Sequence, residues 1–137
     1  MKRQTTKLAI ALLRLPSGKY VFQRRDAKAP SNPNGLALFG GHVDGKESPE
    51  LAVKRELAEE TSIDVSKLKF EYLGKRYFEP DDLPPREVYY FRTDIKSAGF
   101  NVYEGVGAEV YGLEEALERD DINPRVNFIV KKILNNE

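Results

Sequence analysis

Three glutamates, Glu56, Glu59 and Glu60, stand at positions i, i+3 and i+4 of a segment rich in strong helix-forming residues. On a helix these side chains share one face, with β-carbons about 5–6 Å apart, so their negative charges repel one another. They also fall in the last turns, where the helix dipole already presents partial negative charge. Each effect costs up to about 1 kcal/mol, and neither stabilises the chain.

A bound divalent cation would reverse the sign of both effects. Mg²⁺ prefers hard oxygen ligands, neutralises charge on a phosphate and acidifies a bound water, and a remaining carboxylate can orient or deprotonate that water. The alternative is a solvated acidic helix end, because Arg55 lies four residues before Glu59 and can offset part of its charge. Taken alone, the triplet favours this second interpretation.

The helix that must position the glutamates has clear start signals. Ser48 is a good N-cap residue, and Pro49 suits the first helical position, where no amide hydrogen is needed. The segment Glu50–Thr61 contains neither glycine nor proline, so we expect one uninterrupted helix.

Strands and short helices are expected around this helix. We expect strands over Lys7–Leu15, Tyr20–Arg25, Leu36–Phe39 (ended by Gly40 and Gly41), Lys69–Phe78, Glu87–Thr93 and Glu109–Tyr111, helices over Leu113–Asp120 and Pro124–Leu134, and loops over Ala27–Gly35 and Glu79–Arg86. Many strands with few helices predict an α/β (α+β) sandwich in which a mixed β-sheet is flanked by helices. The length of 137 residues fits a single domain over residues 1–137.

Composition limits the classes of partner. Lys plus Arg equals Asp plus Glu at 22 each, so no global charge favours a nucleic acid polymer or an anionic membrane, and neither is expected. The chain has no cysteine, which excludes disulfides, zinc–thiolate sites and a cysteine nucleophile. The apolar run Leu8–Leu13 is too short for a membrane span or a signal peptide, so we expect a cytoplasmic protein.

The residues around the glutamates form a longer pattern. Gly41 is followed after five residues by Glu47 and, after seven more, by Arg55-Glu56-Leu57-Ala58-Glu59-Glu60-Thr61-Ser62-Ile63. This pattern resembles the Nudix box, which reads Gly, five residues, Glu, seven residues, Arg-Glu-aliphatic-x-Glu-Glu-x-Gly-aliphatic. Fixed spacing over 23 residues is far more specific than a lone glycine-rich loop. The segment 21–25 also resembles the second strand common in MutT-like Nudix hydrolases, and the segment 38–41 resembles the usual entry into the box.

The resemblance implies a Nudix fold and a role for each residue of the box. Glu56, Glu59 and Glu60 match the family's metal-binding glutamates, and the carbonyl of Gly40 matches a backbone metal ligand. Arg55 matches an arginine that orients a glutamate, and Glu47 matches a glutamate that supports the loop. The implied cofactor is Mg²⁺ or Mn²⁺. An acid from a later loop often joins the metals or acts as the base, and Glu104 is the first candidate, with Glu109 as the second.

Substrate contacts are expected from residues near the box. Arg24 and Arg25 could reach phosphate, although alternation along a strand predicts that at most one of them faces the site. His42, the only histidine, follows the two glycines and could contact substrate, although a lone loop histidine more often has no such role. Asp44 and Gly45 are interpreted as a turn.

One position departs from the family pattern. Ser62 stands where the family has glycine, a residue that suits the left-handed conformation common just past a helix. Serine in that conformation would cost about 1 kcal/mol. Since no ligand is lost, we expect a slightly strained or rebuilt helix end with the chemistry intact.

The predicted activity is metal-dependent hydrolysis of a phosphoanhydride bond in a nucleoside diphosphate linked to another group, including modified nucleoside triphosphates. The alternatives are hydrolysis of ADP-sugars or dinucleoside polyphosphates, and a non-catalytic Nudix-fold ligand sensor. Sensors usually lose box glutamates, whereas this chain keeps all of them. The expected partner is a small nucleotide, and because dimers are common among relatives, a homodimer stays open.

Overall fold

The computed structural model describes residues 4–29, 32–79 and 84–136. Its strands are β1 (Thr6–Arg14), β2 (Tyr20–Arg24), β3 (Leu36–Ala37), β4 (Phe39–His42), β5 (Glu71–Phe78), β6 (Arg86–Asp94) and β7 (Gly107–Tyr111). Its helices are α1 (Pro49–Glu60), a single 3-10 turn η1 (Val65–Lys67), α2 (Leu113–Leu117) and α3 (Pro124–Asn136). Parts of the predicted loops 27–35 and 79–86 lie outside the described residues.

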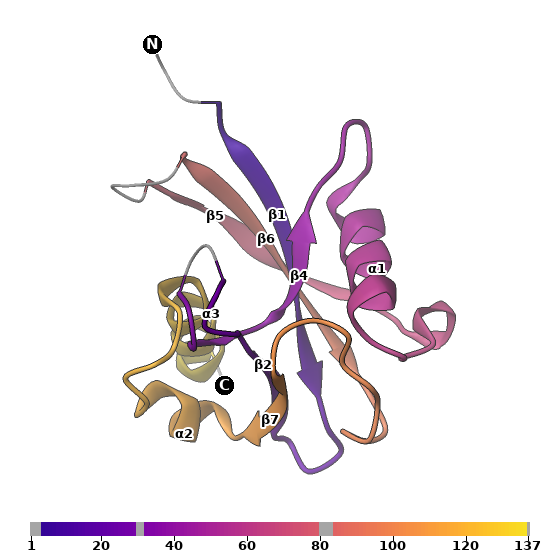
Figure 1. Ribbon diagram of the computed structural model, residues 1–137, viewed down its shortest axis with the longest axis vertical. Helices are drawn as coiled ribbons and strands as arrows, with labels where there is room; N and C mark the ends of the chain where they lie inside the picture. The colour runs from indigo at the N-terminus through magenta and orange to yellow at the C-terminus, as the bar shows by residue number, and fades with distance from the viewer. Residues whose placement is uncertain (1–3, 30–31, 80–83, 137) are drawn as a thin grey trace.

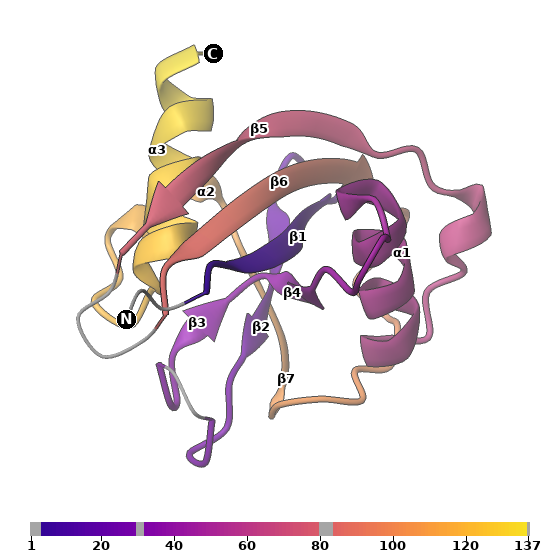
Figure 2. The same cartoon turned by 90° about the horizontal axis from the view of Figure 1, so that it is seen from above.

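The strands form one mixed sheet with β1 at its centre. The order is β3-β2-β1-β6-β5, while β4 also pairs with β1 and β7 with β2. β1 runs parallel to β6 along its whole length and antiparallel to β4, with Ile10 opposite Gly40. Figures 1 and 2 show α1 on one side of the sheet and α2 with α3 on the other. The predicted sandwich of a mixed sheet flanked by helices is confirmed.

Alternation along β1 divides the interior into two cores. Leu8 and Leu12 pack with β6 and α3, whereas Ala9, Ala11 and Leu13 face α1. Because successive strand residues point to opposite faces, one buried strand supports helices on both sides. α3 is anchored in the first core by apolar residues at helical spacing: Val126, Ile129, Val130 and Ile133.

Three local predictions need correction. The single strand that we expected over Leu36–Phe39 is divided at Leu38: β3 ends at Ala37 and pairs with β2, whereas β4 pairs with β1 and continues through Gly40 and Gly41 to His42. Arg86, which we placed in a loop, is the first residue of β6. The 3-10 turn η1 lies in a stretch for which the sequence suggested no element. No helix among the described residues is both long and apolar enough to cross a membrane.

Candidate active site

Helix α1 starts where its sequence signals predict. The hydroxyl of Ser48 accepts a hydrogen bond from the Leu51 amide, and Pro49 occupies the first turn. Ala52, Val53 and Leu57 are fully buried against the sheet. This packing fixes the rotation of the helix, and with it the face that carries the three glutamates.

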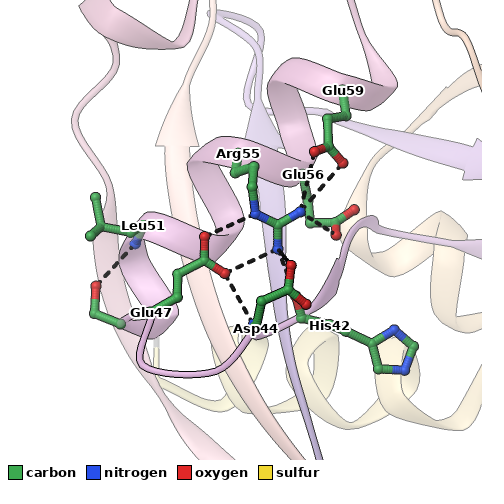
Figure 3. A network of polar contacts seen from close by, with 8 residues as sticks. His42, Asp44, Glu47, Leu51, Arg55, Glu56 and Glu59 are labelled. Atoms are coloured by element: carbon green, nitrogen blue, oxygen red, sulfur yellow. Dashed lines mark hydrogen bonds and ion pairs between the residues drawn. The ribbon is translucent and has the colours of Figure 1, made fainter.

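Arg55 organises the loop before α1 and the helix itself (Figure 3). Its guanidinium donates to both carboxylate oxygens of Glu47, at 2.9 and 3.0 Å, and to the carbonyl of His42 at 2.9 Å. It also donates to Glu56 at 3.0 Å and to Glu59 at 3.3 Å. The Arg55 guanidinium holds the pKa of Glu47 below its usual range. Arg55 thus links Glu47 in the loop to Glu56 and Glu59 on the helix, while the supporting role of Glu47 and the orienting role of Arg55 stay predictions.

The two glycines allow the carboxylates to approach the strand. A β-carbon on Gly41 would lie 2.4 Å from the carboxyl carbon of Glu56, so any side chain there would displace that glutamate. The amide of Gly40 donates to a Glu60 carboxylate oxygen at 2.9 Å, and its φ of 145° is favourable only for glycine. Glycine is required here by close approach rather than by a turn, which explains why β4 runs through both positions.

Glu104 is brought to the end of α1 by backbone hydrogen bonds on both sides of it. The Tyr103 amide donates to the backbone carbonyl of Glu60 at 2.7 Å, and the Val106 amide donates to the backbone carbonyl of Arg24 at 2.9 Å. The loop therefore lies between the last turn of α1 and β2. The candidate acid Glu104 interacts electrostatically with both Glu56 and Glu60.

Crowded negative charge dominates this end of the site. Only 3% of Glu60 is exposed, and burial raises its pKa to about 9, with the like charges of Glu104 and Glu56 adding to the shift and the Gly40 amide opposing it. Burial also raises the pKa of Glu56, although Arg55 lowers it. A cation is the simplest compensation for such a cluster.

The fit to a metal ion can be tested on these donors. Glu56, Glu60 and Glu104 supply hard oxygen atoms at one place, as Mg²⁺ requires. Within the ranges that the structure describes, however, no three acidic or histidine side chains are already close enough to hold a metal. Glu59 is bonded to Arg55 instead, with 56% of its side chain exposed. The donors fit such an ion chemically, and their side chains must adjust to bind it.

The acidic cluster forms one end of a cleft of about 800 Å³ between β4 and the start of α3. This volume is typical of a small-molecule site. Of the residues that we expected to touch substrate, Arg25 and His42 line the cleft. Sequence reasoning missed seven further lining residues with polar or aromatic side chains: Gln23, Asp26, Lys28, Arg86, Tyr103, Asn123 and Arg125.

Two candidates lie elsewhere. Arg24 does not line the cleft; its guanidinium binds Glu109 at 2.6 Å and Asp121 at 2.8 Å. Glu109, the second candidate for the base, is engaged in this ion pair, and the Arg24 guanidinium and the Tyr111 hydroxyl lower its pKa to about 2. Strand alternation explains the choice between Arg24 and Arg25, since neighbouring residues point to opposite sides.

The helix end at Ser62 is rebuilt rather than strained. Thr61 caps α1 in an extended conformation, with φ of −139° and ψ of 166°, and Ser62 has no positive φ. The Ser62 amide donates to the carbonyl of Asn101 at 3.0 Å, and its hydroxyl accepts from the Asn101 amide at 2.8 Å. Serine therefore takes the place of the family glycine by bonding to the segment that leads to Glu104.

Comparison with known proteins agrees with this geometry. The model of the NUDIX domain matches residues 5–130. The solved MutT protein from Methanosarcina mazei Go1 superposes with a TM-score of 0.86 at 21% identity, covering 99% of this chain and 97% of that one. No curated protein matches the chain in sequence.

Two more distant structures share the fold. The E. coli dihydroneopterin triphosphate pyrophosphohydrolase has a TM-score of 0.78 at 13% identity, covering 100% of this chain and 99% of that one. An Ap4A hydrolase from C. elegans has a TM-score of 0.74 at 20% identity, covering 96% of each chain. Since the family model matches residues 5–130 and Glu56 and Glu60 of the box line one cleft, the chain belongs to the NUDIX domain family, and its fold is that of the MutT-like Nudix hydrolases.

Proposed function

We propose that this Nudix-type pyrophosphohydrolase hydrolyses a phosphoanhydride bond in a nucleoside diphosphate linked to another group. The observation that carries the proposal is the gathering of Glu56, Glu60 and Glu104 beside the glycines of β4, at one end of a cleft of about 800 Å³. The proposed ligands of Mg²⁺ or Mn²⁺ are Glu56, Glu59, Glu60 and the carbonyl of Gly40. When bound, the ion would neutralise charge on the phosphates and acidify the attacking water.

The protein's own groups perform the remaining steps. Arg55 keeps Glu56 in place through their 3.0 Å hydrogen bond, which reduces the reorganisation needed when substrate arrives. Glu104 is the proposed general base: it takes a proton from water as the water oxygen bonds to phosphorus and the anhydride P–O bond breaks. The leaving phosphate carries away the electron pair of that bond, and Glu104 later returns its proton to solvent.

The substrate is proposed only as a class. The similar structures include proteins named as a MutT protein, a dihydroneopterin triphosphate pyrophosphohydrolase and an Ap4A hydrolase, so the shared fold accepts phosphoanhydrides that carry different organic groups. Modified nucleoside triphosphates are our first choice, with ADP-sugars and dinucleoside polyphosphates as alternatives. A homodimer and a cytoplasmic location stay predictions.

The test is a panel of nucleoside triphosphates, nucleotide sugars and dinucleoside polyphosphates, assayed for released phosphate, pyrophosphate and monophosphate with Mg²⁺. Chelation should abolish turnover, and Mg²⁺ or Mn²⁺ should restore it. Glu59→Gln and Glu60→Gln should each lower kcat by about 10²- to 10⁴-fold, because the amide keeps the shape but loses the charge. Glu114→Gln, at an exposed position of α2, is the matched control.

Two results would contradict the proposal. Turnover that persists with chelator, or that is unchanged in both glutamine variants, would remove the metal assignment. A panel that binds without being hydrolysed would favour the non-catalytic ligand sensor instead.

A further inference from the structure

The part of the cleft away from the glutamates is basic, since four cations and one further acid, Asp26, line it. Arg25 follows β2, Arg86 begins β6 and Arg125 lies in the first turn of α3, and all three line the same cleft. Exposed Lys28 lines it as well. The fold thus brings cations from three separate elements to one place.

Two of these arginines carry no visible compensation. Within residues 4–29, 32–79 and 84–136, no hydrogen bond or ion pair joins the guanidinium of Arg86 or Arg125 to another side chain or to the backbone. The Nε atom of Arg86 is buried and has no hydrogen-bond partner. A buried donor without a partner is costly, so such a group in a cleft indicates a missing acceptor.

The electrostatics of the cluster point the same way. Burial, followed by repulsion from Arg86, lowers the pKa of Arg125 to about 10, and burial with repulsion from Arg25 lowers the pKa of Arg86. Arg125 also lies at the N-terminus of the 13-residue helix α3, where the helix dipole disfavours a cation and favours an anion. Both arginines remain charged near neutral pH, and one bound anion would relieve all of these effects.

The two ends of the cleft are too far apart to share one phosphate. Gly40 is opposite Ile10 on one side of β1, and Arg86 is opposite Thr6 on the other side. Thr6 and Ile10 are four residues apart, which corresponds to about 13 Å along the strand, and β4 and β6 are separated by about 10 Å across it. The basic end therefore faces a different part of the substrate from the part at the glutamates.

We propose that Arg25, Arg86 and Arg125 bind a second anionic group of the substrate, a phosphomonoester or a carboxylate carried by the part remote from the cleaved anhydride. Guanidinium groups bind both anions through paired, charge-assisted hydrogen bonds. The inference rests on the proposed function, because that function places the cleaved bond at the glutamates. It narrows the substrates to those with negative charge at both ends.

The first test measures anion binding without turnover. Metal-free protein in chelator is titrated with inorganic phosphate, and in parallel with malonate, while backbone amide NMR shifts are followed. Saturable shifts are expected at Arg86 and Arg125, and the stronger ligand tells phosphomonoester from carboxylate. Arg86→Gln and Arg125→Gln should weaken binding by about 10- to 100-fold. Arg14→Gln, whose arginine pairs with Asp94 outside the cleft, is the matched control.

Thermal unfolding separates binding from a structural role. Without anion, Arg86→Gln should melt at the same temperature as the wild type or higher, since it removes a half-buried cation whose buried Nε has no hydrogen-bond partner. Phosphate should raise the melting temperature of the wild type and have less effect on the variant. Arg86→Lys, which keeps the charge, should retain part of the binding. A lower melting temperature with unaltered phosphate binding would overturn the proposal, as would the absence of saturable binding by either anion.

The second test uses matched substrates that differ by one anionic group, such as UDP-glucuronate against UDP-glucose and NADPH against NADH. The ratio of kcat/KM for the charged over the neutral member should exceed 1 and fall about 10- to 100-fold in Arg86→Gln. A preference for the neutral members in the wild type would overturn the inference. Glu60→Gln separates the two hypotheses: it should lose turnover but still bind phosphate at the arginines.

Discussion

Arginine occurs in two contrasting settings in this molecule. Arg24 is bonded to Glu109, Asp121 and the carbonyl of Asn34, and these partners raise its pKa. Arg86 and Arg125, at the basic end of the cleft, have lowered pKa values, and their guanidinium groups have no partner among the described residues. The first arrangement ties β2 to β7 and to the segment before α3. The second contributes nothing comparable to the fold.

The acidic end of the cleft repeats the contrast with the opposite sign. The carboxylate of Glu109 is compensated and its pKa is low, whereas Glu60 is surrounded by Glu56 and Glu104 and its pKa is high. Charged groups that are paired with opposite charges hold elements together, whereas like charges gathered in a cleft indicate a ligand-binding site. Both kinds of charged residue are partly buried, so burial does not distinguish them. Whether a charged side chain has an oppositely charged partner distinguishes structural from functional charges more clearly.

Apart from the glutamate substitutions themselves, the largest effect on the acidic end is expected at Gly41, where the backbone makes room for Glu56. Gly41→Ala places a methyl group about 2.4 Å from the Glu56 carboxyl carbon, so the flexible carboxylate must move. We expect kcat to fall by about 10- to 100-fold because the acidic cluster is displaced. The free energy of unfolding should change little, since only the flexible end of the Glu56 side chain has to move and the backbone does not.

Steady-state kinetics and urea unfolding of the same preparation measure both quantities. Gly99→Ala is the control, because a β-carbon there meets only an ordinary contact at 3.6 Å. A Gly41→Ala variant that unfolds easily yet keeps full activity would show that Gly41 serves the fold rather than the glutamates.

The sequence predicts one end of the cleft far better than the other. Glu56, Glu59 and Glu60 are four residues apart at most, so helical geometry alone relates them, and Ser48 with Pro49 sets where the helix begins. The basic end depends on tertiary structure. Arg86 and Arg125 are far apart in the chain and meet only because β6 pairs with β1 and α3 packs beneath the sheet.

Local patterns also leave genuine ambiguities. Neighbouring Arg24 and Arg25 have the same local propensity, and only the orientation of the residues at the end of β2 assigns one to an ion-pair network and the other to the cleft. Gly40 and Gly41 resemble a strand end because glycine weakens strands, but close approach of Glu60 and Glu56 keeps them within β4.

A smaller effect is expected from breaking the compensated network. Glu109→Gln removes the charge that pairs with Arg24 and should lower the free energy of unfolding by about 1–3 kcal/mol near pH 7. The pKa of Glu109 is lowered from 4.5 to about 2, so its stabilisation is complete above pH 4.5 and is lost as pH falls towards 2. The difference between variant and wild type should therefore shrink over this interval.

Urea unfolding at a series of pH values measures this difference, and kinetics at pH 7 complete the comparison. Since Glu109 lies outside the cleft, kcat should remain within about twofold once the folded fraction is taken into account. A loss of kcat without a loss of stability would instead identify Glu109 as the base and remove the distinction drawn between the two regions.

The smallest effect is expected at the rebuilt end of α1. Ser62→Ala removes the hydroxyl that accepts from the Asn101 amide and should cost about 1 kcal/mol of unfolding free energy. Ser62→Gly should cost slightly more, although it restores the family residue, because glycine adds conformational freedom to the unfolded chain. Ser17→Ala, which removes a local turn contact only, should cost less than about 0.5 kcal/mol.

The position also bears on the acidic cluster, because Asn101 leads directly to Tyr103, whose amide caps Glu60, and to Glu104. If the segment is held mainly by the Tyr103 bond, kcat should be nearly unchanged in both Ser62 variants while stability falls. Urea unfolding and steady-state kinetics of the three serine variants measure this directly. A Ser62→Gly variant that is more stable than the wild type would mean that the family's left-handed helix end is still accessible to this chain. The hydrogen bonds to Asn101 would then not be the reason why the chain tolerates serine at this position.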